Sequence, residues 1–273
     1  MFALALLAAA LGAAGQASGS AADAGHIHAV AFDPGDKALL LGTHDGLYRL
    51  GPSEARPRKV GTVSYDLMGL AAVGRRSYVA SGHPDPAAAR RDGLPANLGL
   101  IRTDDGGRSW RFVSLRGDAD FHVLRARGAR VMAFDVVGRR LLASTNGGRT
   151  WTPRPVPDGA NDLALGPSAG RVVASTADGL QISPDGGLTY RMLRRGIGPG
   201  LVAWPSRTRI VLVDAGGTVL VSSDGGRRFS RRAALGGTPT ALAATNEKVA
   251  VVLESGRLLL SRDGGRAFTT VSR

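Results

Sequence analysis

The sequence predicts an all-β fold built from repeated four-stranded units, and three observations lead to this prediction. Glycine accounts for 39 of the 273 residues and aromatic residues for only 5%, which favours many turns over long helices. Short apolar runs such as RVVAS, IVLV, VAVVL and RLLLS are typical of buried strands. An eight-residue motif also recurs at a nearly constant interval, which indicates a repeat architecture.

The motif occurs five times and aligns without gaps. Its copies are TDDGGRSW from Thr103, STNGGRTW from Ser144, SPDGGLTY from Ser183, SSDGGRRF from Ser222 and SRDGGRAF from Ser261. Their third residues, spaced 39 to 41 positions apart, are Asp105, Asn146, Asp185, Asp224 and Asp263. The Asp or Asn side chain accepts backbone N–H groups, glycine supplies a positive φ, and the final aromatic, such as Trp110 or Trp151, returns into the sheet. Each copy is therefore predicted to be a structural hairpin turn, which we call a clip.

The clips resemble the Asp-box, or BNR, repeat Ser-x-Asp-x-Gly-x-Thr-Trp of the sialidase-like β-propellers. In that family the motif lies between the third and fourth strands of a blade, and a period near 40 residues corresponds to one four-stranded blade. The resemblance covers residues 26–273 and implies a six-bladed β-propeller of four-stranded antiparallel blades with Asp-box turns. The expected blades are about 26–63, 64–115, 116–156, 157–195, 196–234 and 235–273.

The first expected blade has no clip. It is included because THDGL at 43–47 matches TADGL at 176–180 in the fourth blade. The chain is expected to begin with an innermost strand and to finish with an outermost one, so the first and last blades exchange no strand. Closure of the ring would then depend on packing between these two blades.

Residues 1–24 are expected to form a signal peptide. The apolar run at 2–14 is too short to span a bilayer and leads into small residues, although no Lys or Arg precedes it. A buried N-terminal helix is the alternative, but caps and an amphipathic period are missing. The chain contains no Cys, which excludes disulfides and a Cys-linked lipid anchor. We therefore expect an exported monomer, periplasmic or extracellular, without a membrane span.

The formal charge of +13 raises the question of nucleic acid binding. Of the 35 basic residues only Lys37, Lys59 and Lys248 are lysines, and this arginine bias with abundant Ala and Gly indicates a GC-rich coding sequence. In an exported protein the charge favours anionic envelope polymers or membrane surfaces. Nucleic acid is therefore not an expected partner.

All the histidines lie between residues 26 and 122, and they are the candidate metal ligands: His26, His28, His44, His83 and His122. In the blade alignment they stand where innermost strands start or second strands end, on the face opposite the clips. Asp66, Asp120, Asp135 and Asp162 map to the same face. Imidazole with carboxylate suits zinc or another divalent transition metal, and Met68 nearby would favour copper. For any single histidine, a satisfied polar residue at a strand end is the commoner alternative.

The segment 83–100, HPDPAAARRDGLPANLGL, is longer than the corresponding loops of the other blades. It is either a lid at the histidine face, with Arg90 and Arg91 available for an anionic group, or a tolerated surface insertion.

The resemblance to sialidases suggests glycoside hydrolysis. Those enzymes use an arginine triad, a Tyr nucleophile beside a Glu, and an early Phe-Arg-Ile-Pro motif; LYRL at 47–50 lacks the proline, and no Tyr has a Glu suitably placed beside it. A two-carboxylate glycosidase stays open, with Asp66, Asp120 and Asp162 as candidate catalytic residues and Glu254 on the same face. The strings HIHAVAFDP, SGHP, NLGLIRTDDGGRSW and DFHVL also resemble small exported bacterial Asp-box proteins labelled glycosylhydrolase family members.

We therefore expect an exported propeller that binds a ligand or a divalent metal, zinc or copper, through histidines over its first three blades. The ligand would be a small molecule, a glycan or an envelope protein. Glycoside hydrolysis is the second hypothesis. A protein-binding scaffold, as in the photosystem assembly factors and sortilins that share the repeat, is the third.

Overall fold

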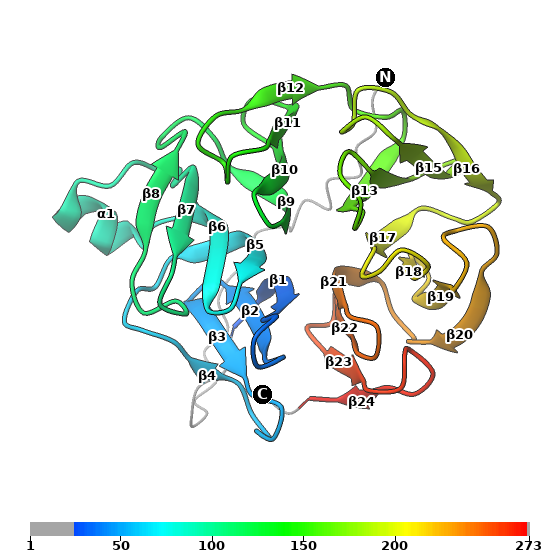
Figure 1. Ribbon diagram of the computed structural model, residues 1–273. Coiled ribbons are helices and arrows are strands. Elements are labelled where there is room, and N and C mark those ends of the chain that lie inside the picture. Colours follow the sequence, from blue (N-terminus) through cyan, green and yellow to red (C-terminus); the bar gives the residue numbers. More distant parts are fainter. Residues whose placement is uncertain (1–24, 272–273) are drawn as a thin grey trace.

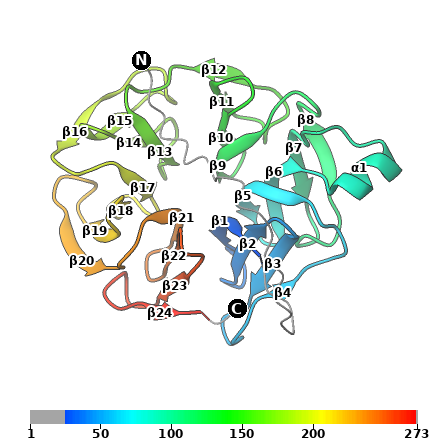
Figure 2. The ribbon, with the colours of Figure 1, turned by 180° about the vertical axis from the view of Figure 1, so that it is seen from behind.

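Six four-stranded antiparallel sheets stand in a ring around a central axis in the computed structural model, which describes residues 25–271 (Figures 1 and 2). Four consecutive strands form each sheet, the first nearest the axis and the fourth at the outer edge. We number these blades 1 to 6 in chain order. The expected six-bladed β-propeller is therefore confirmed. The expected signal peptide, residues 1–24, lies outside the described residues.

The strands have the following bounds. Blades 1 and 2 contain β1 (Ile27–Phe32), β2 (Leu39–Thr43), β3 (Gly46–Leu50), β4 (Arg58–Lys59), β5 (Asp66–Gly74), β6 (Ser77–His83), β7 (Leu100–Thr103) and β8 (Arg111–Ser114). Blades 3 and 4 contain β9 (Phe121–Arg127), β10 (Arg130–Asp135), β11 (Arg140–Ser144), β12 (Thr152–Arg154), β13 (Ala160–Leu165), β14 (Val172–Thr176), β15 (Gly179–Ser183) and β16 (Arg191–Arg195). Blades 5 and 6 contain β17 (Gly200–Ala203), β18 (Ile210–Asp214), β19 (Thr218–Ser222), β20 (Ser230–Ala234), β21 (Pro239–Ala244), β22 (Val249–Leu253), β23 (Leu258–Ser261) and β24 (Thr269–Thr270).

A single helix, α1 (Pro86–Asp92), occurs among residues 25–271, between β6 and β7. The Asp85 side chain caps it by accepting the N–H groups of Ala87 and Ala88, both at 2.9 Å. Figure 1 shows α1 at the outer edge of the ring, away from the central axis. Within the described part of the chain, no helix is long and apolar enough to cross a bilayer.

Both faces of each blade are buried because each face packs against a neighbouring blade. In β2, Leu39 and Leu41 join an apolar cluster with blade 6, whereas Leu40 joins a cluster with blade 2. Successive side chains of a strand point to opposite faces, so a strand between two neighbours must be apolar at every position. This explains why the second strands read as continuous apolar runs.

The ring closes between blades 1 and 6, and among the described residues no strand is shared between them. Their facing side chains form one apolar cluster, which includes Ile27, Leu41, Tyr48, Ala243, Val252 and Leu260. Closure therefore depends on packing rather than on strand exchange, as the sequence predicts.

The five clips lie between the third and fourth strands of blades 2 to 6 and share one hydrogen-bond network. In blade 2 the Thr103 hydroxyl accepts the N–H of Gly107 at 2.9 Å and donates to Asp105 Oδ1 at 2.7 Å. Asp105 also accepts the N–H of Ser109 at 3.0 Å. Equivalent contacts recur at Ser144 and Asn146, Ser183 and Asp185, Ser222 and Asp224, and Ser261 and Asp263.

Each clip is also tied to the turn between the first and second strands of its own blade. The N–H of Gly106, for example, donates to the carbonyl of Arg76 at 2.8 Å, and the first glycines of the other four clips make the same bond. The clips and these turns therefore lie together on one face of the ring, which we call the clip face.

The aromatic residue of a clip packs toward the preceding blade. The Trp151 ring lies 5.1 Å from that of Phe121, centroid to centroid, and its Nε1–H donates to Ser114 of blade 2 at 2.9 Å. Trp110 packs, partly buried, into the cluster shared by blades 1 and 2. The clip aromatics thus reinforce contacts between blades.

The second glycine of a clip makes room for the neighbouring blade. Gly148 has a φ of +85°, and a Cβ on it would lie 2.0 Å from Cδ2 of the fully buried Leu100 in blade 2. Gly147 has a similar φ of +75°, but its Cβ would meet nothing within 4 Å. Gly148 is therefore required for packing as well as for backbone conformation.

Replacement of Gly148 by alanine is expected to lower the free energy of unfolding more than Gly147→Ala does. Both changes force a side chain into the left-handed region, at a cost of about 1 kcal/mol. Only Gly148→Ala also drives a methyl group into Leu100, and such overpacking adds about 1–3 kcal/mol. Denaturant unfolding of both variants measures the difference. Equal destabilisation would mean that Leu100 moves aside at no cost.

Candidate metal centre

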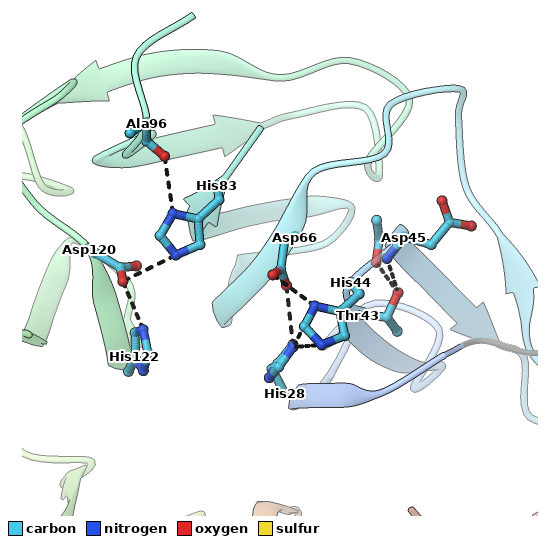
Figure 3. A network of polar contacts seen from close by, with 10 residues as sticks. His28, Thr43, His44, Asp45, Asp66, His83, Ala96, Asp120 and His122 are labelled. Carbon is cyan, nitrogen blue, oxygen red and sulfur yellow. Dashed lines mark hydrogen bonds and ion pairs between the residues drawn. The ribbon is translucent and has the colours of Figure 1, made fainter. Parts of the chain in front are cut away.

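The five histidines form two groups on the face opposite the clips. Figure 3 shows four of them, His28, His44, His83 and His122, with Asp66 and Asp120. The first triad is His26, His28 and His44, and the second triad is His83, Asp120 and His122. In each triad, one ligand atom from every residue lies within 4.8 Å of the others. Blades 1, 2 and 3 and the turns that join them supply these residues. The structure thus divides the shared site that we expected into two.

A β-bulge presents one histidine of each triad. The pairing of β1 with β2 shifts between Ile27 and Ala29, so His28 is the extra residue. The pairing of β9 with β10 skips His122 in the same way. A bulge bends its strand and re-aims the side chain of the extra residue, and bulges are common beside functional sites. Three other innermost strands have the same irregularity, at Met68, Asn161 and Thr240.

In the first triad the three imidazoles are packed against one another. His28 Nε2 lies 3.2 Å from both ring nitrogens of His44, and the centroids of the His26 and His28 rings are 4.6 Å apart. The side chain of His28 is 12% exposed and that of His44 56%. The His44 side of the triad is therefore open to solvent, whereas the His28 side chain is largely buried.

Asp66, at the start of β5, connects the first triad to blade 2. Its Oδ2 lies 2.8 Å from His44 Nδ1, and its Oδ1 lies 3.3 Å from His28 Nε2. Burial raises the pKa of Asp66, but the hydrogen bonds from His28 and His44 outweigh burial and hold it below its ordinary value. Asp66 is therefore a carboxylate at neutral pH and supplies a fourth donor beside the three imidazoles.

The second triad is centred on the buried Asp120. Its Oδ2 lies 2.8 Å from His122 Nε2 and 3.4 Å from His83 Nε2. Burial raises the pKa of Asp120, but the hydrogen bonds from His122 and His83 outweigh it and hold the pKa well below the usual range. The contact with Asp120 in turn raises the pKa of His83 to about 9, against the opposing effect of burial. At neutral pH His83 and Asp120 therefore form an imidazolium–carboxylate pair within this triad.

Each triad adjoins a buried carboxylate oxygen that is short of hydrogen bonds. Asp120 Oδ1 has no hydrogen-bond partner among the described residues, and Asp66 Oδ1 has only the 3.3 Å contact with His28 Nε2. Buried polar atoms are nearly always paired, so an orphaned carboxylate oxygen beside converging imidazoles indicates a missing cation or donor.

The two triads are neighbours in the fold. Asp66 of β5 and His83 of β6 are directly opposite each other in the antiparallel pair. Gly82 permits this pairing, because its φ is +149° and a Cβ on it would lie 1.8 Å from the carbonyl oxygen of Asp66. A glycine before the SGHP histidine is the sequence signal that could have identified the close approach of the two strands.

The long segment between β6 and β7 contributes to the second triad through its backbone. The carbonyl of Ala96 accepts a hydrogen bond at 3.0 Å from His83 Nδ1, and Leu98 N donates to Gly82 O at 2.9 Å. The bond to the Ala96 carbonyl orients the His83 imidazole so that its Nε2 faces Asp120. Arg90 and Arg91 lie in α1, and Arg91 pairs with Asp92 at 2.9 Å.

Asp162 does not join either triad. The bulge of blade 4 falls at Asn161, so Asp162 is one position further along the strand than the blade alignment implied. Its side chain is 1% exposed, pairs with Arg125 at 2.6 Å and accepts the N–H of Val202 at 2.9 Å. Asp162 therefore links blades 3, 4 and 5.

Other candidates on this face also lie outside the triads. Asp135 is fully buried, where it accepts the N–H of Asp120 at 3.1 Å and pairs with Arg140 at 2.9 Å. Met68 occupies the bulge position of β5, and Glu254 is exposed on blade 6 and belongs to neither triad. By accepting the N–H of Asp120, Asp135 positions the backbone of that member of the second triad.

No protein-family model matches the chain, and no curated protein sequence matches it. Solved structures match by shape. A chain of the nidogen–laminin complex is 13% identical with a TM-score of 0.66, over 86% of this chain and 93% of that one. YCF48 from Cyanidioschyzon merolae is 14% identical with a TM-score of 0.51, over 90% and 85%. The GH74 xyloglucanase from Xanthomonas campestris is 15% identical with a TM-score of 0.56, over 90% and 45%. At these identities the chain is similar to them in fold alone.

Proposed function

We propose that this protein is exported and holds two divalent transition-metal ions, zinc or copper, at its histidine face over blades 1 to 3. One observation carries the proposal: two separate triads each bring three nitrogen or oxygen donors within 4.8 Å, beside a buried carboxylate oxygen that is short of hydrogen bonds. A metal ion would satisfy such a set, because it accepts lone pairs from several imidazoles and a carboxylate at one point.

The two triads suit different roles. At the first triad three imidazoles would hold the ion, and Asp66, which contacts His28 and His44, would supply the fourth ligand of a closed tetrahedral site. Two imidazoles with Asp120 at the second triad offer three, which leaves a coordination position for water or an exogenous ligand. The Ala96 carbonyl would fix the tautomer of His83 in the loaded state.

The hydrolase hypothesis has less support. A glycosidase needs a carboxylic acid with a raised pKa that can reach its substrate. The pKa values of Asp66 and Asp120 are both lowered. Burial raises the pKa of Asp162, but its oxygens are occupied by Arg125, Leu163 N and Val202 N and its side chain is enclosed. The similarity to a xyloglucanase is one of fold. We propose an envelope protein or a glycan as the ligand of the metal-loaded face.

We expect the purified protein, stripped with chelator and reloaded, to retain two Zn²⁺ or Cu²⁺ ions. His28→Ala should remove the first ion and His122→Ala the second, so each variant retains one and the double variant none. Elemental mass spectrometry of desalted samples counts the ions. Asp92→Asn, which changes an exposed carboxylate on α1, is the matched control and should retain both.

Retention of no metal by the wild type, or unchanged retention in both variants, would contradict the proposal. Turnover of a fluorogenic glycoside that survives chelation but is lost in Asp120→Asn would favour hydrolysis instead.

The stability of the metal-free protein should fall at alkaline pH. The pKa of His83 is raised from 6.5 to about 9 by Asp120, so its contribution is complete below pH 6.5 and is lost as the pH rises through about 9. The Tm should therefore drop more between pH 7 and pH 10 for the wild type than for His83→Gln. Parallel pH profiles of the two proteins would show that the ion pair does not form.

A further inference from the structure

A second feature of the fold, on the other side of the ring from the triads, is a cavity of about 610 Å³ along the central axis. The ends of all six innermost strands line it, together with the turns that follow β1 and β21. Those turns are on the clip face, because the clip glycines bond to the turns between first and second strands. The cavity therefore extends to the clip face, and its size is in the range of small-molecule sites.

The wall of the cavity is apolar and its mouth is charged. Short side chains such as Ala31, Ala72 and Ala164 line the wall. The ionisable residues that line the cavity are Lys37, Arg125, Arg127, Lys248, Asp33 and Glu247. Small wall side chains leave the axial space open, and the charged groups are confined to its ends and turns.

Two of these charges are already neutralised or engaged. Arg125 pairs with the buried Asp162 at 2.6 Å. Asp33 accepts the N–H groups of Gly35 and Arg76 and the hydroxyl of Tyr78. The other carboxylate of the lining is Glu247. With Arg125 neutralised, Lys37, Arg127 and Lys248 against Asp33 and Glu247 leave an excess of one positive charge.

Arg127 is held in place without being neutralised. Its guanidinium donates to the carbonyls of Leu165 at 3.3 Å and Trp204 at 2.6 Å, and no carboxylate of the described residues lies within ion-pair distance. The side chain is half-buried, and burial together with the charge of Arg130 lowers its pKa. A partly desolvated cation that is bonded only to carbonyls is costly, and an anion would relieve that cost.

The two lysines meet where the ring closes. The ammonium of Lys248 in blade 6 lies 3.4 Å from the carbonyl oxygen of Lys37 in blade 1, and neither lysine forms an ion pair among the described residues. Trp204, which also lines the cavity, has a buried indole N–H without a partner. Apart from the carboxylate of Glu247, the uncommitted groups of this lining are donors or cations, which points to an acceptor as the missing partner.

We propose that this cavity binds a small organic phosphate, with the phosphate held at the mouth by Arg127, Lys37 and Lys248 and the organic part against the apolar wall. Lys37 and Lys248 line the cavity where blades 1 and 6 meet, and Arg127 lines it from blade 3. Three cations match a dianion better than a single carboxylate, and the planar guanidinium bonds phosphate oxygens in pairs. The site is separate from the metal triads, because different residues on the opposite face form it.

Calorimetric titration of the metal-free protein with phenyl phosphate tests the proposal. We expect saturable binding, weakened at least tenfold in Arg127→Gln and several-fold in Lys248→Gln, with partial recovery in Arg127→Lys. Inorganic phosphate should bind more weakly than phenyl phosphate, because it leaves the apolar wall unused. Phenol should not compete, because it lacks the anion.

Matched controls separate this site from general attraction to a basic protein and from the metal proposal. Arg149→Gln removes an exposed arginine of a clip outside the cavity, and His122→Ala removes a triad ligand; both should bind phenyl phosphate as the wild type does. Equal weakening by Arg149→Gln and Lys248→Gln, or undiminished binding in Arg127→Gln and Lys248→Gln, would overturn the proposal. Because Arg127 bonds two other blades, Lys248→Gln and Lys37→Gln keep the test valid if Arg127→Gln does not fold.

Discussion

The burial of each sheet between two neighbours is the constraint on which the whole structure depends. An isolated blade would expose both of its apolar faces to water, and each fully buried Leu, Ile or Val contributes about 1.5–3 kcal/mol only once a neighbour covers it. The alternation of Leu39, Leu40 and Leu41 between blades 6 and 2 shows the consequence within one strand. Every blade must therefore be wedge-shaped and closely fitted, and the second glycine of each clip and the aromatic that follows meet that requirement.

Because the faces of the sheets are used for packing, polar chemistry is confined to the two ends of the ring. A few buried polar contacts are exceptions, and they link neighbouring blades. Asp33 bonds Tyr78 across blades 1 and 2, and Asp162 bonds Arg125 across blades 4 and 3. The histidine–aspartate triads lie at one end of the ring, and Lys37, Arg127 and Lys248, which form no ion pair among the described residues, lie at the other. Strands hold His28, His83, His122 and Arg127, and the adjoining turns hold the other residues of the two sets.

Much of the fold could be predicted from the sequence because its signals are local. A clip is determined by eight residues, and five clips in register give the period, the blade count and the strand order. Even blade 1, which has no clip, was identifiable from THDGL, since the Thr43 hydroxyl bonds Gly46 O at 2.9 Å just as Thr176 bonds Gly179 O at 2.8 Å in blade 4.

The site was less predictable because its geometry depends on register and on the backbone. Residue type and strand position placed the five histidines on one face, but alternation patterns do not show a bulge, and the bulge at Asn161 moves Asp162 to a buried position. The division into two triads depends on lateral distances between blades. The Ala96 carbonyl, which orients His83, leaves no mark in the sequence, because every residue has a carbonyl.

The repeated bulge has a consequence for how such a ring acquires chemistry. The same backbone irregularity occurs in five innermost strands, at His28, Met68, His122, Asn161 and Thr240. The backbone that presents a side chain there is therefore independent of the identity of that side chain. A propeller of this kind therefore offers one equivalent position in each of several blades. A single substitution at such a position can change the chemistry of that blade without changing the backbone that supports it.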